Sequence, residues 1–353
     1  FQMNCRDGLR YGTGEAFVQP ALKRPNFTLE TGAHVRKLVF EGKHCVGVRY
    51  RQERALLTAR AKREVILAAG AVGSPHLLLL SGVGPAAHLR EQGIEVVHEL
   101  PGVGQNLHDH LFVPMTFRAP TSGHRGSPGH FFAGMFKELA LGTMGRGGTW
   151  FGRTVFESGA FLKSSPDQPI PDIQFHTLPW GYPDPNQDGP DRPHVDDGYC
   201  FTLMPTLIYP KSRGEVKLRT SDPEGTPIFD PHYLEHPDDM KLLVTAMRLG
   251  RQIMSSPKIR GLLGDELQPG THAASDEALA DEVRLRATTV YHPVGTCRMG
   301  KDKDAVVDPK LRVHGIEGLR VADGSIMPQI TGGNTNAPCI MIGEKAAAII
   351  QKG

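Results

Sequence analysis

The sequence predicts a mixed α/β (α+β) fold in two domains, and three stretches carry that prediction. Residues 64–69 form an apolar run, which a turn of small residues joins to an apolar segment of helical character. Residues 319–323 repeat the strand-then-loop pattern before a second helical segment, 337–351. Between these two regions, alternating polar and apolar residues predict an antiparallel sheet with one face covered.

Short strands also dominate the first part of the chain. Alternation over 27–31, 34–40 and 45–50, with a turn at 41–43, predicts a meander. Residues 12–16 begin like a phosphate-binding loop, but no strand precedes them and a third glycine is missing. A turn or a helix start is therefore the expected structure there.

The strand–turn–helix at 64–84 is the sharpest local pattern. Ser74 is a good N-cap, Pro75 suits the first helical position, and Gly82 can end the helix. The small residues from Gly70 to Gly73 allow a ligand to approach the backbone closely. Plain packing of a helix on a sheet favours the same residues, so the pattern alone does not separate the two interpretations.

The middle of the chain predicts a separate, substrate-type domain. Strands are expected at 172–176, 201–204 and 215–219, and helices at 238–254 and 276–288. Loops rich in glycine and proline, such as 183–190, separate them. The aromatic residues of this region either line a pocket or fill the core of the sheet: Trp150, Phe175, Trp180 and Tyr182.

Composition excludes several classes of protein. Forty lysines and arginines nearly balance 38 aspartates and glutamates, which gives no reason to expect nucleic acid as a partner. Five scattered cysteines without metal spacing favour a reducing compartment. No signal peptide or membrane-spanning run is visible, so a cytoplasmic or membrane-peripheral location is expected. Because the chain starts at Phe1, we expect that it lacks its natural N-terminus.

Histidines mark two candidate sites. His108-Asp109-His110 suggests a metal site, but the two rings point to opposite faces of an extended chain and no further ligands lie nearby in sequence. A turn with buried, hydrogen-bonded side chains is expected instead, and no metal. His292 precedes a proline, which favours an extended backbone. An imidazole and an asparagine amide near a helix start could surround a ligand, although an ordinary buried histidine explains the same spacing.

Four motifs, in order, resemble those of the GMC (glucose–methanol–choline) flavoprotein oxidoreductases, in particular the choline-dehydrogenase-like branch. These motifs are the stretch from Gly70 to Gly84, Pro-Gly-Val-Gly-Gln-Asn-Leu-His-Asp-His, His-Pro-Val-Gly-Thr-Cys-Arg-Met-Gly, and the C-terminal run that contains Gly-Asn-Thr-Asn-Ala-Pro. The resemblance covers the chain from about Asn26 to its end. It implies an FAD-dependent enzyme that oxidises the CH–OH group of an alcohol.

The resemblance also implies roles for individual residues. His292 would abstract the hydroxyl proton while a hydride passes to flavin N5, and Asn334 would donate a hydrogen bond to the developing alkoxide. The amides at the start of the 337–351 helix would stabilise the reduced ring. The residues implied in cofactor binding are Val35, Ala69, Gly70, Ala322, Asp323, Asn334 and Thr335.

The family's strand–G-x-G-x-x-G–helix unit is not found in this sequence. We therefore expect an N-terminally truncated FAD/NAD(P)-binding type domain, formed by residues 1–112 and 284–353, and an antiparallel-sheet substrate-binding domain, 113–283. A catalytically silent fragment that binds no flavin by itself is the alternative.

The resemblance leaves the substrate and the electron acceptor open. A choline-like substrate would need an aromatic or acidic cage for its ammonium group, for which Trp150, Trp180 and Glu157 are candidates. Another primary alcohol fits equally well. The acceptor is expected to be oxygen or a quinone-like carrier.

Overall fold

The computed structural model describes residues 4–7, 9–119, 136–137, 140, 156, 158–182 and 200–352. Trp150, Glu157 and the 183–190 loop lie outside these residues. The chain divides into two units. Unit 1 contains residues 1–28, 111–208 and 236–290, and unit 2 contains residues 29–110, 209–235 and 291–353.

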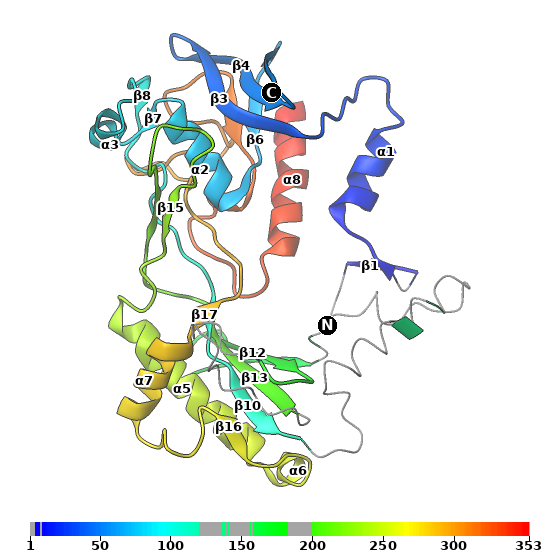
Figure 1. Cartoon of the computed structure of the whole chain (residues 1–353), viewed down its shortest axis with the longest axis vertical. Coiled ribbons are helices and arrows are strands. Elements are labelled where there is room, and N and C mark those ends of the chain that lie inside the picture. The colour runs from blue at the N-terminus through cyan, green and yellow to red at the C-terminus, as the bar shows by residue number, and fades with distance from the viewer. Residues whose placement is uncertain are drawn as a thin grey trace. The chain divides into compact units, whose positions relative to one another are not determined.

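Unit 1 is built on an antiparallel sheet, as the alternation predicted (Figure 1). The strand order is β11-β12-β13-β10-β16, and β9 joins β13 to β17. The bounds are Leu111–Phe112 (β9), Met115–Arg118 (β10), Gly159–Leu162 (β11), Ile173–Leu178 (β12), Cys200–Leu207 (β13), Glu266–Gln268 (β16) and Thr288–Thr289 (β17). Three helices follow the long strands: α5 (Pro237–Met254), α6 (Pro257–Arg260) and α7 (Asp276–Arg286).

Helix α5 covers one face of this sheet through its buried stripe. At Gly250 an added Cβ would lie 3.0 Å from the sulfur of Met115 and 3.1 Å from a methyl of Leu203. The absence of a side chain at this position therefore lets the helix approach strands β10 and β13 closely. On the described part of the opposite face, Phe112, Leu178 and Met204 form a small apolar cluster with Trp180 and Tyr182 packed against it. These two aromatic residues are partly buried core residues.

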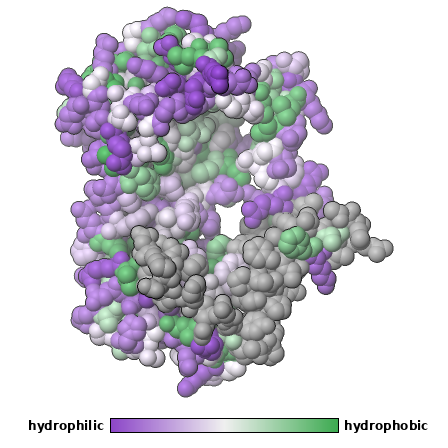
Figure 2. Space-filling model, viewed as in Figure 1, coloured by the Kyte–Doolittle hydropathy of each residue, from purple (hydrophilic) through white to green (hydrophobic). Residues whose placement is uncertain are grey.

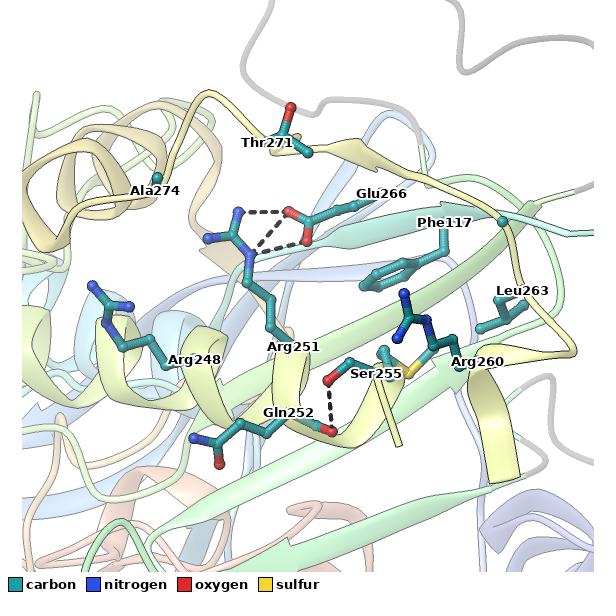
Figure 3. A pocket seen from close by; sticks show the side chains of 12 residues that line it. Phe117, Arg248, Arg251, Gln252, Ser255, Arg260, Leu263, Glu266, Thr271 and Ala274 are labelled. Carbon is teal, nitrogen blue, oxygen red and sulfur yellow. Dashed lines mark hydrogen bonds and ion pairs between the residues drawn. The ribbon is translucent and has the colours of Figure 1, made fainter. Parts of the chain in front are cut away.

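Unit 1 also contains a cavity of about 610 Å³ beside α5 and β16 (Figure 3). Arg251 reaches across it and pairs with Glu266 through two nitrogens, at 2.7 and 2.9 Å. The same guanidinium donates to the carbonyls of Gly270 and Ala273. All three groups lie after α5 in the chain, so this arginine fastens β16 and the following loop to the helix.

The N-terminal part of unit 1 begins with a hairpin, β1 (Cys5–Arg6) and β2 (Leu9–Arg10). A π-helical turn, η1 (Gly14–Val18), and a short helix, α1 (Gln19–Ala21), follow it. The helix start expected at 12–16 is confirmed. Residues 27–31 are not in a strand, so the strand predicted there is wrong.

Unit 2 begins with a three-stranded antiparallel sheet: β3 (Ala33–Glu41), β4 (His44–Gln52) and β5 (Ala55–Arg60). The predicted turn at 41–43 joins the first two strands, with Gly42 at φ +62°. The third strand of the meander lies after, not before, the other two. It was missed because all six of its residues are exposed and lack a clear apolar face.

The two strand–loop–helix segments of unit 2 come together as parallel neighbours. Strand β6 (Val65–Leu67) pairs in parallel with β18 (Leu319–Val321). In this register Val65 lies opposite Leu319, which is 254 residues later in the chain. Each strand leads to a helix: α2 (Gly70–Leu80) and, after the turn η2 (Gly324–Ile326), α8 (Asn336–Gln351). Figure 1 shows α2 and α8 in cyan-blue and red. The smaller elements are β7 (Val83–Gly84), α3 (Ala86–Glu91), β8 (His98–Glu99), β14 (Glu215–Lys217) and β15 (Ile228–Asp230).

The core of unit 2 is formed by leucines of α2 and by residues of the last segment. Leu78 and Leu79 are 0% and 1% exposed and belong to one cluster with Val294, Cys297 and Val321. The segment that follows His292, which contains Val294 and Cys297, therefore packs directly into this hydrophobic core.

Hydrophilic residues predominate on the face shown in Figure 2, and hydrophobic ones form scattered patches among the described residues. Within the described parts of the chain, none of the helices has the length and apolar character needed to cross a bilayer.

Candidate functional site

The turn between β6 and α2 is held by a carboxylate from the end of β18. Asp323 Oδ2 accepts hydrogen bonds from the backbone N–H of Gly70 at 2.9 Å and from the Ser74 hydroxyl at 2.5 Å. Its other oxygen accepts from the Ser325 N–H at 2.8 Å. Gly70 has φ +77°, a conformation that favours glycine, and an added Cβ would meet nothing within 4 Å. Open space therefore lies beside the backbone at this turn.

Helix α2 begins five residues earlier than the N-cap pattern predicted, with Ala69 as its N-cap, and the prediction of Ser74 as N-cap is wrong. Ser74 is instead an interior residue whose hydroxyl accepts from the Ala69 N–H and donates to Asp323. Pro75 stands inside the helix and leaves the carbonyl of Ala71 without its usual partner. The buried hydroxyl of Thr296 donates to that carbonyl at 2.6 Å. The threonine that follows His-Pro-Val-Gly thus replaces the missing helical hydrogen bond.

Two residues implied in cofactor binding line one cavity. Val35 of β3 and Ala69, just before α2, both border a space of about 460 Å³. Its remaining walls come mainly from apolar side chains of β4, β6 and α2, among them Val48 and Leu77. An apolar cleft beside a strand-to-helix turn can accept a flat ring at the end of a polar chain.

The other implied cofactor residues lie at the end of β18 and the start of α8. Ala322 donates its N–H to the carbonyl of Leu67, which links it to β6. Thr335 is the N-cap of α8, yet its side chain makes no capping hydrogen bond, and Pro338 carries no N–H. The first turn of this 16-residue helix therefore keeps backbone amides that its own cap does not satisfy.

His292 is held in an unusual backbone setting. Tyr291, which precedes it, has φ +62°, a left-handed conformation that a non-glycine residue adopts at a cost of about 1 kcal/mol. The backbone N–H of His292 donates to Asp109 Oδ1 at 2.8 Å. Two residues later, Val294 exchanges backbone hydrogen bonds with His108, at 3.0 and 3.2 Å. Asp109 and the strand-like bridge fix the loop on both sides of the imidazole.

The structure brings His292 and Asn334 together. The amide nitrogen of Asn334 lies 3.3 Å from His292 Nε2. Burial lowers the pKa of His292 from its ordinary value, and the negative charge of Asp109 partly opposes this by raising it. The imidazole is therefore neutral at pH 7, the form that can accept a proton.

A second histidine stands against His292. His110 Nδ1 lies 3.0 Å from His292 Nδ1, and the two rings meet edge to face, with centroids 5.2 Å apart and planes at 85°. His110 is 0% exposed and Asp109 is 2% exposed. Asp109 Oδ2 also accepts from the Tyr233 hydroxyl at 2.7 Å.

His108 has a different role from His110: its ring is buried and hydrogen-bonded, as the sequence predicted for this turn. Its Nδ1 contacts the carbonyl of Asn106 at 2.7 Å and its Nε2 accepts from the Ile330 N–H at 2.9 Å. Because both ring nitrogens bind main chain, the ring is neutral and cannot ligate a metal. Burial, with Arg213 nearby, lowers the pKa of His108 to about 4. Among the described residues, no group of three potential metal ligands occurs.

Sequence reasoning missed the roles of Asp109, His110, Tyr233 and Thr296. The motif that contains the first two was recognised, but sequence does not show that it folds against His292, 182 residues away from His110. Thr296 had a usable signal, because a proline inside a helix leaves a carbonyl that another group must satisfy.

Comparison with known proteins agrees with this arrangement. Two family models, each described as GMC oxidoreductase, match residues 1–112 and 210–343. An alcohol dehydrogenase (acceptor) of Pseudomonas putida is 41% identical over 360 residues, and an oxygen-dependent choline dehydrogenase of Brucella melitensis is 41% identical over 353. Each alignment covers 99% of this chain but only 62% of the relative.

Solved structures agree as well. Pyridoxine 4-oxidase from Mesorbium loti superposes with a TM-score of 0.82 at 29% identity, covering 99% of this chain and 63% of that one. A formate oxidase of Aspergillus oryzae, described with its FAD modification, gives 0.81 at 27% identity, covering 94% and 62%. The ordered motifs, the fold and these matches together show that the chain belongs to the GMC oxidoreductase family.

Proposed function

We propose that this chain carries the catalytic residues of an FAD-dependent oxidoreductase acting on the CH–OH group of a primary alcohol. The observation that carries the proposal is the pair formed by His292 Nε2 and the Asn334 amide, 3.3 Å apart. The pair combines an uncharged base with a neutral hydrogen-bond donor at one point. Alcohol oxidation needs both, since a proton must leave the hydroxyl and the oxygen that remains carries developing negative charge.

The residues present fit FAD. The open space at Gly70 and the apolar cavity between Val35 and Ala69 suit the adenosine half of the molecule. Asp323 Oδ1, which accepts one hydrogen bond from the protein, can accept another and suits the hydroxyls of the ribityl chain. The uncapped amides of α8, which begins after the N-cap Thr335, suit the electron-rich edge of the ring, and Ala322 at the end of β18 is proposed to bind the same cofactor. FAD, when bound, supplies the acceptor for the hydride that leaves the alcohol carbon.

The chain's own residues perform the acid–base work in this proposal. His292 Nε2 takes the hydroxyl proton, and its buried position keeps it neutral until substrate arrives. Asn334 donates a hydrogen bond to the alcohol oxygen and stabilises it as the proton leaves. Asp109 and the bridge between Val294 and His108 hold the imidazole in place throughout.

In this proposal, residues within 1–112 and 284–353 bind FAD, and residues within 113–283 bind the substrate. The substrate proposed is a small alcohol, choline-like or otherwise, in keeping with the names of the relatives. The electron acceptor proposed is oxygen or a quinone-like carrier.

An FAD titration of the purified 353-residue chain tests the proposal first. The expected result is a bound, yellow flavin whose colour is lost when an alcohol is added without oxygen. A panel that includes choline and an uncharged primary alcohol, with an artificial dye as acceptor and with or without air, identifies substrate and acceptor. A chain that stays colourless after the titration supports the alternative, a fragment that does not bind flavin by itself.

A further inference from the structure

Asp109 and His110 are deeply buried polar groups that contact His292. Neither contacts the alcohol in the function proposed above. Both nevertheless direct their polar atoms at His292: Asp109 at its backbone N–H and His110 at its ring. Charged and polar side chains with exposures of 2% and 0% are costly unless such contacts compensate them.

The contacts of the His292 ring determine which of its nitrogens carries the proton. The nitrogen of the Asn334 amide can only donate, so Nε2 of His292 must accept and carries no hydrogen. In the neutral ring the hydrogen then lies on Nδ1. That N–H is 3.0 Å from His110 Nδ1, which accepts it. The contact with His110 is compatible with the tautomer that the Asn334 amide requires, with the lone pair of Nε2 directed at Asn334.

Asp109 acts on the same ring through charge. One of its oxygens accepts from the His292 backbone and the other from Tyr233, so the carboxylate is held in place by two donors. Its negative charge favours the imidazolium that would form when Nε2 gains a proton, against the effect of burial. Among the described residues, the titratable groups in contact with His292 or with Asp109 thus include Asp109, His110 and Tyr233, from the segments 104–110 and 209–235.

We propose that His110 and Asp109 are positioning residues for His292: His110 holds the ring in the Nδ1–H tautomer, and Asp109 supplies the counter-charge of its protonated form. This inference rests on the proposed function of His292 as the base. Its proton balance is simple. Nε2 gains the hydroxyl proton, Nδ1–H stays on His292 and continues to donate to His110, and Asp109 stays ionised.

Nitrogen NMR of isotopically labelled histidine measures the tautomer directly and needs no activity. In the wild-type chain, His292 is assigned by the signals that disappear in His292→Gln, and the expected form is Nδ1–H. A wild-type ring protonated at Nε2 overturns the inference without any variant at position 110, so a failure of such a variant to fold leaves the test intact.

Two variants at position 110 separate an acceptor from simple bulk. His110→Leu removes the acceptor, and we expect His292 to lose Nδ1–H as its main form. His110→Gln keeps an acceptor oxygen without an imidazole, and we expect it to retain the wild-type tautomer. If both folded variants retain the Nδ1–H tautomer of His292, or if both lose it, His110 does not act as the proposed acceptor.

The charge of Asp109 is tested by titrating His292 in the same spectra. Asp109→Asn preserves an oxygen for the backbone N–H but removes the charge, and we expect the pKa of His292 to fall by about one unit. Glu344→Gln, on an exposed part of α8 in the same unit, is the matched charge control and should leave that pKa unchanged. An unchanged pKa in Asp109→Asn contradicts the proposal. A correct tautomer and pKa in a chain that oxidises no alcohol would contradict the proposed function alone.

Discussion

Two polar centres of unit 2 lie in neighbouring motifs and use their side chains in opposite ways. At the β6–α2 turn, both oxygens of Asp323 accept hydrogen bonds from the protein, two from backbone amides and one from Ser74. At the 291–294 loop, the backbone of His292 is bound by Asp109, while its ring meets only other side chains, His110 and Asn334. Asp323 therefore holds the β6–α2 turn in place. At the 291–294 loop, by contrast, the uncharged Nε2 of His292 lies beside the amide donor of Asn334.

Removing the Asp323 carboxylate should have the largest effect on stability. Asp323→Ala leaves the Gly70 and Ser325 amides and the Ser74 hydroxyl without their buried acceptor. Each lost charged hydrogen bond costs about 1.5 kcal/mol or more, so we expect a loss of about 4 kcal/mol in the free energy of unfolding. The melting temperature, measured by circular dichroism, should fall by roughly 10 °C.

Asp323→Asn is the matched control, because it keeps one acceptor oxygen and loses the charge. Its melting temperature should lie between those of the wild type and Asp323→Ala. Equal stability of the wild type and Asp323→Ala would contradict the scaffold role of this carboxylate.

The next largest effect is a pH dependence that belongs to His108. Its folded-state pKa of about 4 lies below the ordinary value of 6.5, so the unfolded chain binds the proton first as the pH falls. The stability from the neutral ring is complete above pH 6.5 and declines down to about pH 4, by about 3 kcal/mol. Urea denaturation at several pH values measures this decline.

His108→Gln removes the titrating group and serves as the comparison. The wild type should lose about 3 kcal/mol more than this variant between pH 6.5 and pH 4. Parallel stability curves for the two proteins would show that His108 is not buried as a neutral ring.

A smaller loss is expected at the hydroxyl that serves helix α2. Thr296→Val has nearly the same shape but leaves the buried carbonyl of Ala71 without a donor, at a cost of about 2 kcal/mol. Thr296→Ser keeps the hydroxyl and should recover most of the difference in urea midpoint. Equal midpoints for Thr296→Val and the wild type would mean that Pro75 needs no compensation.

The smallest effect on stability should follow from Asn334→Ala. Asn334 is exposed, and its side chain contacts the His292 ring, so the free energy of unfolding should change by less than about 0.5 kcal/mol. In the NMR experiment, however, His292 should lose its fixed tautomer. A large fall in melting temperature would assign Asn334 to the scaffold, together with Asp323.

Local patterns predicted much of the fold, and long-range contacts account for most of what they did not. The strand–turn–helix at 64–84 was found because a turn of small residues separates an apolar run from an apolar segment of helical character. Its helix start was misplaced, because Ser74 looks like a cap in sequence whereas its hydroxyl serves Asp323, 249 residues away. Strand β5 was missed because exposed residues on a short edge strand carry no periodic signal.

The candidate site shows the same division. His292 and Asn334 were identified through motifs, and the structure brings them to 3.3 Å. Asp109 and His110 were expected only to be buried and hydrogen-bonded, because a sequence names no partner for a buried side chain. Their partner became visible once the chain between 110 and 292 was folded.

The central claim, that His292 is the base for alcohol oxidation, is tested most directly by anaerobic mixing of an alcohol with the FAD-loaded chain and its His292→Ala variant. The rate at which the flavin loses its yellow colour is measured in both. Loss of a general base should slow that rate by about 10²-fold or more while FAD remains bound, because Asn334 and the turn at Gly70 are unchanged. Bleaching of the variant at the wild-type rate would contradict the assignment of His292.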